Sequence, residues 1–478
     1  MSKQFDVVVI GGGPGGYIAA IRAAQLGFNT ACIDAWTNAA GGPAPGGTCT
    51  NVGCIPSKAL LQSSEHFEHA GHSFADHGIG LKDLSIDVKK MLARKNTVVK
   101  QNNDGILYLF KKNKVSFFHG RGAFAKAVEG GYEVTVGDET LVGKNVIVAT
   151  GSSARALPGT PFDEEQILSN DGALKIGAVP KKLGLIGAGV IGLEMGSVYA
   201  NLGSKVTVVE LLDGLLMAAD RDLVKPLQKR LEHLFDKRIY LNTKVGSMAE
   251  VDNQIEVTFE GPGKYGHERF DRVLVSVGRR PVSRGIGLEN TQVELTKSGF
   301  AVIDSQQRTA DPHIFAIGDV AGEPMLAHKA SHEAKVAIEV LLGEPATFDK
   351  AAIPAVVFTD PEIAWAGLTE EEAKKSGRVV DVEVYPWAAS GRAQALGRTE
   401  GLTKWLVDPE THRVLGCGIV GAGAGELIAE AVLAIEMGCE VRDLTEAIHP
   451  HPTLSETLMN AGEVHFGTAT EIYKPKRH

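Results

Sequence analysis

Two cysteines, Cys49 and Cys54, lie five positions apart in the glycine-rich segment GGTCTNVGCIPSK. The chain contains five cysteines in all, and a protein inside a cell gains little from a structural disulfide because its thiols are kept reduced. A close pair is then more often catalytic or metal-binding. Zinc would need a second cysteine or histidine pair at suitable spacing, and the tight pair His449 and His451 carries a proline after each member. The spacing therefore favours redox use of the thiols, with a buried thiol pair as the alternative.

The segment between the two cysteines cannot be regular helix if they are to bond. In an ideal α-helix, Cα atoms five residues apart are separated by roughly 8.6 Å, whereas a disulfide requires about 4.4–6.8 Å. Gly53 suits an irregular turn before Cys54, and Pro56 suits the first turn of a helix that follows. Lys58, four residues after Cys54, would then lie on the same helical face, so its ammonium group would act on anything stacked against that thiol.

These residues must be positioned by larger elements, and the first is a nucleotide-binding unit at the N-terminus. The stretch FDVVVIGGGPGG is an apolar strand that runs into Gly11-x-Gly13-x-x-Gly16, followed by an alanine-rich helical pattern up to Leu26. Such glycines let the backbone approach a pyrophosphate, and the helix N-terminus supplies N–H donors. A second strand ends at Asp34, where a carboxylate can hold a ribose hydroxyl.

The same pattern returns 176 residues later in KLGLIGAGVIGLEMGSVYANLGSKVTVVE, with Gly187, Gly189 and Gly192 in the loop and Glu210 at the end of the second strand. One glycine motif is weak evidence, but two copies in register predict two dinucleotide-binding domains. Glu210 suits the free 2′-hydroxyl of NAD and would repel the 2′-phosphate of NADP. In a flavin enzyme, the first unit would then hold FAD.

A third apolar strand ends at an acidic residue. The stretch TADPHIFAIGD (309–319) predicts a strand whose carboxyl end places Asp319 at a ligand crevice, and Asp319 as an exposed turn residue is the alternative. Another strand, VIVATGS (146–152), ends where the chain leaves the first domain.

The segment HPHPTLSE near the C-terminus offers an acid–base pair. Thiol–disulfide exchange requires a thiolate, and a histidine titrates near neutrality. His449 and His451 are each followed by proline, which would aim an imidazole, and Glu456 could hold its tautomer. The alternative is a capping box from Thr453 to Glu456 that opens the next helix. Both interpretations can hold, because one carboxylate can accept from a backbone N–H and an imidazole.

Length and composition limit the classes of protein. The 478 residues predict about three or four domains. A net charge of −9 argues against a nucleic-acid surface, and no apolar run reaches the roughly 18 residues that cross a bilayer. The N-terminal sequence enters a strand at once, which leaves no room for a signal peptide. We therefore expect a cytoplasmic protein without nucleic-acid or membrane partners.

The motifs GGTCTNVGCIPSK, IGAGVIGLE, FAIGD and HPHPTLSE together resemble the pyridine nucleotide–disulfide oxidoreductase family along essentially the whole chain. The resemblance implies an α/β fold with two Rossmann-like dinucleotide-binding domains and a C-terminal α+β dimerisation domain. It implies an FAD-binding domain over 1–151, an NAD-binding domain over 152–281, a central domain that completes the FAD site over 282–350 and an interface domain over 351–478.

The same resemblance assigns roles to the reactive residues. Cys49 and Cys54 would form a redox disulfide, with Cys49 exchanging with substrate and Cys54 facing the flavin. Lys58 would lie near the flavin and pair with Glu194. His451 would be the base, supplied by the opposite subunit of a homodimer and held by Glu456, while His449 would be structural.

Further cofactor contacts are implied by position in the motifs. The residues implied for FAD are Gly122, Gly151, Asp319, Ala327 and His328, and those implied for NAD are Val277 and Gly278. The segment 36–48 is longer and richer in glycine and proline than in many members, and GRRPV replaces a commoner ending with asparagine. These departures touch cofactor contacts only.

Within the family, the continuation IPSKALL and the ending HPTLSE resemble members that oxidise protein-bound dihydrolipoyl groups to lipoyl and reduce NAD more than they resemble glutathione reductase. Partners would then be lipoyl domains of 2-oxo acid dehydrogenase complexes and of the glycine cleavage complex. Alternatives are a disulfide reductase of the glutathione or mercuric reductase type, or a non-catalytic flavoprotein subunit. The mercuric type requires a C-terminal cysteine pair, whereas the last cysteine here is Cys439.

Overall fold

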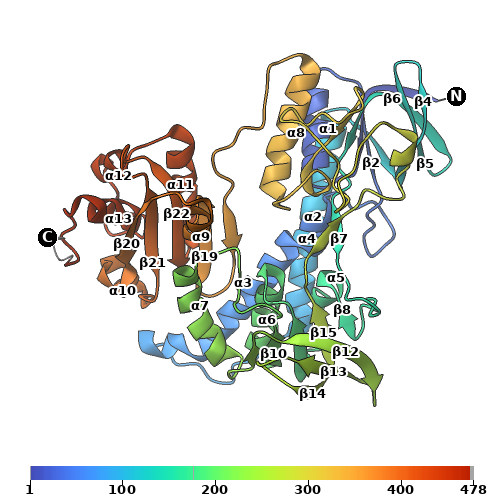
Figure 1. The fold of residues 1–478 in the computed structure, drawn as a ribbon. Helices are drawn as coiled ribbons and strands as arrows, with labels where there is room; N and C mark the ends of the chain where they lie inside the picture. The colour runs from blue at the N-terminus through green and yellow to red at the C-terminus, as the bar shows by residue number, and fades with distance from the viewer. Residues whose placement is uncertain (1, 176, 474–478) are drawn as a thin grey trace.

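The first sheet is built around the N-terminal strand in the computed structural model, which describes residues 2–175 and 177–473 (Figure 1). It has seven strands, and its parallel strands follow the order β3–β2–β1–β6–β17. The other two, β4 and β5, form an antiparallel meander with the first half of β6. The bounds are β1 Lys3–Ile10, β2 Thr30–Asp34, β3 Ser116–His119, β4 Gly122–Val128, β5 Gly131–Val136, β6 Glu139–Val148 and β17 Ile314–Ala316.

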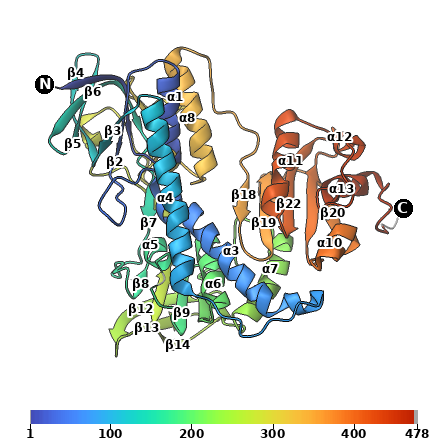
Figure 2. The ribbon, with the colours of Figure 1, turned by 180° about the vertical axis from the view of Figure 1, so that it is seen from behind.

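Helices cover the apolar strands of this sheet. The last four residues of β1 and all of β2 are buried, which is typical of parallel strands with both faces covered. Helix α1 (Pro14–Gln25) and helix α8 (Ala327–Leu342) pack against each other over one face (Figures 1 and 2). Ala19, Ala23 and Ala337 belong to this packed layer, so small side chains let the two helices approach closely.

The second sheet repeats the architecture of the first. Its five parallel strands follow the order β11–β10–β9–β15–β8, and helix α6 (Val190–Asn201) follows β9 as α1 follows β1. The meander β12–β13–β14 is antiparallel. The predicted pair of Rossmann-like domains is confirmed. The bounds are β8 Ile167–Leu168, β9 Lys182–Ile186, β10 Lys205–Val209, β11 Ile239–Tyr240, β12 Lys244–Val251, β13 Gln254–Glu260, β14 Gly266–Phe270 and β15 Arg272–Val275.

Two long helices connect the first domain to the second. Helices α3 (Cys54–Gly71) and α4 (Val88–Lys112) leave the first sheet between β2 and β3, and leucines of α3 enter the core around α6. A ribbon of β7 (Ser152–Ala154) and β16 (Arg279–Pro281) marks the two passages of the chain between the domains. The remaining helices before the C-terminal domain are α2 Gly47–Val52, η1 Ser73–His77, α5 Asn170–Ala173, α7 Arg221–Leu234, η2 Leu288–Asn290 and η3 Gly318–Val320.

The C-terminal domain is an antiparallel sheet packed against helices. Its strands follow the order β18–β19–β22–β21–β20, with α11 over β19 and β22 and α13 over β20 and β21. This is the predicted α+β domain. The bounds are β18 Ala355–Val357, β19 Glu362–Gly367, α9 Glu370–Ser376, β20 Asp381–Pro386, η4 Trp387–Ala389, α10 Gly391–Leu396, β21 Leu402–Val407, β22 Val414–Gly421, α11 Ala424–Met437, α12 Val441–Glu446 and α13 Glu456–Phe466.

Residues 282–350 supply β17 and α8 to the first domain, so that domain is assembled from two separated parts of the chain. The domain boundaries given above remain predictions. Among the described residues, each helix is either too short or too polar to span a lipid bilayer.

Candidate active site

A disulfide joins Cys49 in α2 to Cys54 at the start of α3. The Cα–Cα distance is 4.7 Å, well below the roughly 8.6 Å of a continuous helix. The helix breaks at Gly53, where an added Cβ would lie 2.9 Å from the Thr48 carbonyl oxygen and 3.2 Å from the Cys49 Cα. Glycine therefore permits the close approach that the disulfide requires. Cys54 is exposed and Cys49 half-buried, and the two are joined as a disulfide, which favours redox use over a buried thiol pair.

Lys58 lies one turn after Cys54 in α3 and forms an ion pair with Glu194 of α6. The Lys58 Nζ is 2.8 Å from Glu194 Oε2. Glu194 is 3% exposed, whereas the lysine side chain is one-third exposed. The pair thus joins the disulfide-bearing helix of the first domain to helix α6, which follows β9 in the second domain, as the contact between α3 and α6 allows.

The glycine loops are shaped for close backbone approach. Gly11 and Gly187 have φ of +108° and +97°, and an added Cβ would lie 2.2 Å from the Ala149 carbonyl oxygen in the first loop and 2.6 Å from that of Ser276 in the second. An added Cβ at Gly16 or Gly192 would lie 1.8 Å or 2.4 Å from the carbonyl oxygen of the first glycine in its loop. These four positions therefore accept only glycine.

The middle glycines face open space instead. An added Cβ at Gly13 would meet Gly47 at 3.8 Å, and one at Gly189 would have no neighbour within 4 Å among the described residues. Gly13 and Gly189 are also the N-cap residues of α1 and α6. In each loop the helix N-terminus therefore faces a space that any side chain at the middle glycine would occupy. A pyrophosphate group requires such a space beside the backbone N–H groups of a helix N-terminus.

A cavity of about 210 Å³ lies beside the second loop. Its lining includes Gly189, Val190, Ser276 and Gly278, which come from the carboxyl ends of β9 and β15. Gly278 has φ of +106°, and Val277 precedes it in the same turn. A ligand crevice at this edge of a parallel sheet is the common arrangement in doubly wound folds.

Asp34 and Glu210 make equivalent hydrogen bonds at the ends of β2 and β10. Asp34 accepts from the backbone N–H of Gly12 at 2.6 Å and of Trp36 at 2.8 Å. Glu210 accepts from the N–H groups 176 positions later, those of Ala188 at 2.7 Å and Leu212 at 2.8 Å. Burial raises the pKa of the Asp34 carboxyl, while the two N–H groups act in the opposite direction.

The other residues predicted for FAD lie around the carboxyl edge of the first sheet. Gly151 (φ +73°) follows β6, Asp319 is in η3 directly after β17, and Ala327 is the first residue of α8. Gly122 begins β4, where an added Cβ would lie 3.0 Å from the Ile10 side chain. His328 bonds instead to the Pro354 carbonyl oxygen at 2.8 Å through its Nε2.

Asp319 belongs to a polar network that the sequence did not reveal. The Ser152 hydroxyl donates to Asp319 Oδ2 at 2.5 Å, and Arg279 donates through Nε to the Ser152 hydroxyl at 2.7 Å. Burial lowers the pKa of the Arg279 guanidinium, which Asp319 opposes. In the sequence, Arg279 stands out only as part of the GRRPV ending, and its position directly after Gly278 is the signal that identifies it as a candidate.

His451 and Glu456 are paired as predicted from HPHPTLSE. The His451 Nδ1 is 2.8 Å from Glu456 Oε1, and Glu456 Oε2 accepts from the Thr453 N–H at 2.7 Å. One carboxylate therefore orients the imidazole and caps the turn before α13. The His451 side chain is 80% exposed. His449 is buried, with Nε2 2.7 Å from Glu430 Oε1.

The histidine pair and the disulfide lie in different parts of the chain. Helices α12 and α13, which flank His451 in sequence, lie on the side of the C-terminal domain away from α2 (Figure 1). The described chain thus brings together the disulfide, Lys58, Glu194 and the first glycine loop, and it leaves His451 and Glu456 apart from them.

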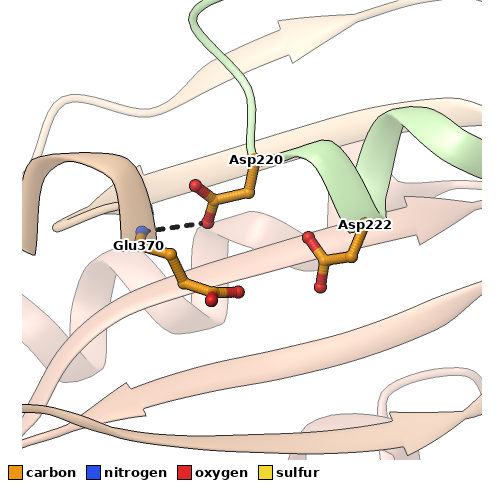
Figure 3. Close-up of side chains that lie close together, drawn as sticks. All are labelled: Asp220, Asp222 and Glu370. Atoms are coloured by element: carbon orange, nitrogen blue, oxygen red, sulfur yellow. Dashed lines mark hydrogen bonds between the residues drawn. The ribbon is translucent and has the colours of Figure 1, made fainter. Parts of the chain in front are cut away.

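Three carboxylates also gather at the boundary between the second and C-terminal domains. Figure 3 shows Asp220, Asp222 and Glu370 close together. The Nζ of Lys404 on β21 lies 2.8 Å, 2.7 Å and 2.6 Å from them, respectively. Burial lowers the pKa of the Lys404 ammonium group, but its bonds to the carboxylates raise the pKa overall. A lysine ammonium group thus occupies the position that a cation would take.

The fold and this site define a flavin- and nucleotide-dependent disulfide oxidoreductase class, and the comparisons agree. Residues 5–334 match the family model described as pyridine nucleotide-disulphide oxidoreductase, and residues 353–461 match the dimerisation domain of the same family. The chain therefore belongs to the pyridine nucleotide-disulphide oxidoreductase family, which confirms the resemblance drawn from its motifs.

Particular relatives narrow the class. The chain is 46% identical over 464 residues to the dihydrolipoyl dehydrogenase of Cupriavidus necator, covering 96% of this chain and 98% of the relative. It is also 46% identical to the mitochondrial dihydrolipoyl dehydrogenase 1 of Arabidopsis thaliana, covering 96% and 90%. Among solved structures, LpdA of Mycobacterium tuberculosis superposes with a TM-score of 0.87 at 27% identity, covering 96% of this chain and 99% of that chain.

Proposed function

We propose that this chain has dihydrolipoyl dehydrogenase activity: it oxidises protein-bound dihydrolipoyl groups to lipoyl and reduces NAD. The observation that carries the proposal is the Cys49–Cys54 disulfide at the α2–α3 break, within a chain 46% identical to dihydrolipoyl dehydrogenases over nearly its full length. Glutathione and mercuric reductase activities have no comparable observation in their favour.

The residues of the first domain fit FAD. Gly11, Gly13 and Gly16 form the cradle for its pyrophosphate, Asp34 accepts at the ribose position, and Asp319 lies at the same sheet edge. We assign the turns at Gly122, Gly151 and Ala327 to further backbone contacts with FAD. When bound, FAD supplies an acceptor for the electron pair of the dithiol and a hydride donor for NAD.

The residues of the second domain fit NAD. Gly187, Gly189 and Gly192 open onto the cavity beside β9, and Gly278 lines it. Two backbone N–H groups donate to the Glu210 carboxylate and fix its orientation. We assign this negative charge to the ribose position of the nucleotide. The chain therefore selects a free 2′-hydroxyl.

The thiol chemistry takes place at Cys49. A dihydrolipoyl thiolate attacks the Cys49 sulfur, the Cys49–Cys54 bond breaks, and Cys54 leaves as a thiolate. The second dihydrolipoyl sulfur then attacks the sulfur bonded to Cys49, which releases lipoyl and leaves Cys49 reduced. The substrate loses two electrons and two protons: the electrons reduce the protein disulfide, one proton passes to His451 and the other protonates Cys49. Lys58, paired with Glu194, places a positive charge on the face of α3 that carries Cys54.

His451 takes the proton from the attacking thiol. With Nδ1 bonded to Glu456, its exposed Nε2 is left to accept a proton. In our proposal this histidine acts in the partner subunit's site, because α12 and α13 lie away from α2 within one chain (Figure 1). The dimerisation domain supports a homodimer. Lipoyl domains of 2-oxo acid dehydrogenase complexes, and of the glycine cleavage complex, are the proposed partners.

The proposal is tested with purified protein, dihydrolipoamide and NAD⁺, followed by NADH absorbance. We expect turnover by the wild type and none by Cys49→Ser or Cys54→Ser. Oxidised glutathione and Hg(II), each with NADPH, serve as competing substrates. Reduction of either one without turnover of dihydrolipoamide would overturn the proposal.

The choice of nucleotide rests on Glu210. We expect a strong preference for NAD⁺ over NADP⁺ in kcat/KM, and a loss of roughly tenfold of that preference in Glu210→Gln, because one charge repulsion at a partly exposed site is worth roughly 1–2 kcal/mol. Asp213→Asn, which removes an exposed charge three residues later, is the control and should leave the preference unchanged. Equal use of both nucleotides by the wild type would contradict the assignment.

A further inference from the structure

We propose that Phe358, from the C-terminal domain, is a positioning residue for the Lys58–Glu194 pair beside the redox disulfide. The role of Phe358 in catalysis rests on the proposed function, whereas its positioning of Lys58 and Glu194 rests on contacts within the chain. Phe358 follows β18 and contacts both members of the pair. The sequence did not mark it, because one phenylalanine before a turn carries no motif that points to chemistry.

The first contact fixes the carboxylate. The backbone N–H of Phe358 donates to Glu194 Oε1 at 3.0 Å, while Lys58 Nζ donates to Oε2 at 2.8 Å. Each oxygen thus has its own partner. Because Glu194 is 3% exposed, water does not compete for these oxygens, and the N–H group sets the plane in which the carboxylate lies.

The second contact fixes the ammonium group. The Lys58 Nζ lies 4.6 Å from the centre of the Phe358 ring, within the range of a cation–π interaction. The Ser57 hydroxyl, at 3.4 Å, is the only other hydrogen-bond partner found for Nζ among the described residues besides Glu194. A lysine on a flexible four-carbon stem could otherwise swing about its single carboxylate partner. The ring limits that freedom on one side of the ammonium group.

Phe358 is itself held on both sides. The preceding residue, Val357, is fully buried and pairs with Ile363 of β19. Two residues later, Asp360 is bonded to Arg398, and its Oδ2 lies 3.5 Å from His69 Nε2. His69 belongs to helix α3, which also carries Lys58. The backbone on both sides of Phe358 is therefore fixed, and the ring itself packs against the core around α6. A fixed backbone and a packed ring are what a positioning residue requires.

The position of the Lys58 ammonium group affects the Cys54 thiolate. Lys58 lies one helical turn after Cys54, so the place of its ammonium group determines how strongly the Cys54 thiolate is stabilised. Replacing the ring with an aliphatic side chain of similar volume should let the ammonium group spread over several positions. The thiolate fraction of Cys54 at neutral pH then falls.

The test measures Cys54 directly in the FAD-loaded full-length protein. In a Cys49→Ser background, the rate of alkylation of Cys54 by iodoacetamide at pH 7 is followed by peptide mass. We expect Phe358→Leu to lower this rate roughly threefold or more, and Phe358→Tyr to restore it, because tyrosine keeps the aromatic face. Neither NAD nor a dihydrolipoyl substrate is needed, so failure of the proposed function would not affect the result.

Two comparisons separate positioning from packing. Val357→Ala shortens a neighbouring buried side chain but keeps the ring and the backbone pairing with Ile363 that holds it, so the rate should stay near that of the wild type. In a Lys58→Met background, Phe358→Leu should have no further effect, because the group that it positions is gone. The inference would be overturned if Val357→Ala slowed alkylation as much as Phe358→Leu does. It would also be overturned if Phe358→Leu still slowed alkylation in the Lys58→Met background. If Phe358→Leu does not fold, Phe358→Met takes its place with the same expectations.

Discussion

At the scale of residues, four carboxylates of the site share one hydrogen-bonding arrangement. Asp34, Glu194, Glu210 and Glu456 each accept a backbone N–H on at least one oxygen, which fixes the orientation of the carboxylate. Glu194 and Glu456 use the second oxygen for a cationic or titratable side chain. The sequence left open whether Glu456 is a partner of His451 or a helix cap. It is both, because one carboxylate oxygen bonds to His451 and the other accepts from the Thr453 N–H.

Glu65, in the fourth turn of α3, should make stability depend on pH. Burial and the charges of Asp360 and Glu362 raise its pKa to about 7, against the effects of His69 and Arg398. Because the folded pKa lies above the unfolded value of 4.5, the folded state holds its proton longer. Its contribution is therefore fully favourable at low pH and is lost as pH rises from about 4.5 to about 7.

We accordingly expect Glu65→Gln to be more stable than the wild type at pH 8, by roughly 1–3 kcal/mol, with the difference shrinking toward pH 5. Denaturant unfolding at a series of pH values measures this, and Glu129→Gln, at an exposed carboxyl on another part of the chain, is the control. A constant difference between pH 5 and pH 8 would contradict the prediction.

At the scale of elements, the break between α2 and α3 determines whether the cysteines can bond. A continuous helix through Cys49 and Cys54 would hold their Cα atoms too far apart, and the break at Gly53 brings them to 4.7 Å. The sequence indicated the need for such a break from geometry. The atoms that Gly53 avoids, the Thr48 carbonyl oxygen and the Cys49 Cα, became known only from the fold.

Gly53→Ala should therefore shift the thiol–disulfide equilibrium toward the dithiol. The added methyl group forces the two helix ends apart at a cost of roughly 1–3 kcal/mol, which is roughly 5-fold to 150-fold in the equilibrium constant. Equilibration in lipoate–dihydrolipoate mixtures followed by thiol trapping measures it. Gly71→Ala, at the other end of α3, where the added Cβ has a neighbour at 3.5 Å, is the matched control. Equal midpoints for the two variants would show that Gly53 has no such role.

At the scale of the whole molecule, Lys404 ties the second domain to the C-terminal domain. Its side chain is 0% exposed and bonds to Asp220 and Asp222 at the start of α7 and to Glu370 of α9. Lys404→Met leaves these carboxylates without their cation, and we expect a loss of roughly 3–5 kcal/mol in the free energy of unfolding. Calorimetry checks this against Lys3→Met, which breaks an exposed pair with Glu139 and should cost about 1 kcal/mol or less.

The second prediction at this scale concerns the shared site. A Cys49→Ser chain and a His451→Gln chain, each inactive alone, should recover roughly half of the normal activity per hybrid dimer when co-expressed. One of the two equivalent sites then joins an intact Cys49 to an intact His451 of the other subunit. Differently tagged subunits allow the hybrid to be purified before its activity is measured.

The double variant supplies the reciprocal control. A chain carrying both Cys49→Ser and His451→Gln, paired with a wild-type chain, should form an inactive hybrid, because each site then lacks one partner. If His451 served its own chain, the results would reverse: the first hybrid would be inactive and the second would keep half of its activity.

The sequence by itself determined what is local or periodic. The spacing of Gly11, Gly13 and Gly16, repeated 176 positions later, was sufficient for two nucleotide-binding domains, because strand, tight turn and helix are contiguous. The need for a break between Cys49 and Cys54 followed from helix geometry alone. The pairing of His451 with Glu456 was accessible for the same reason, since five residues separate them.

Tertiary structure alone decided the contacts between distant segments. Phe358 meets Lys58 and Glu194 although 300 and 164 positions separate them, Arg279 reaches Ser152 and through it Asp319, and Lys404 fills a space among three carboxylates from two domains. Such contacts leave no periodic trace in one chain, because the packing of whole domains, and not local spacing, brings their atoms together.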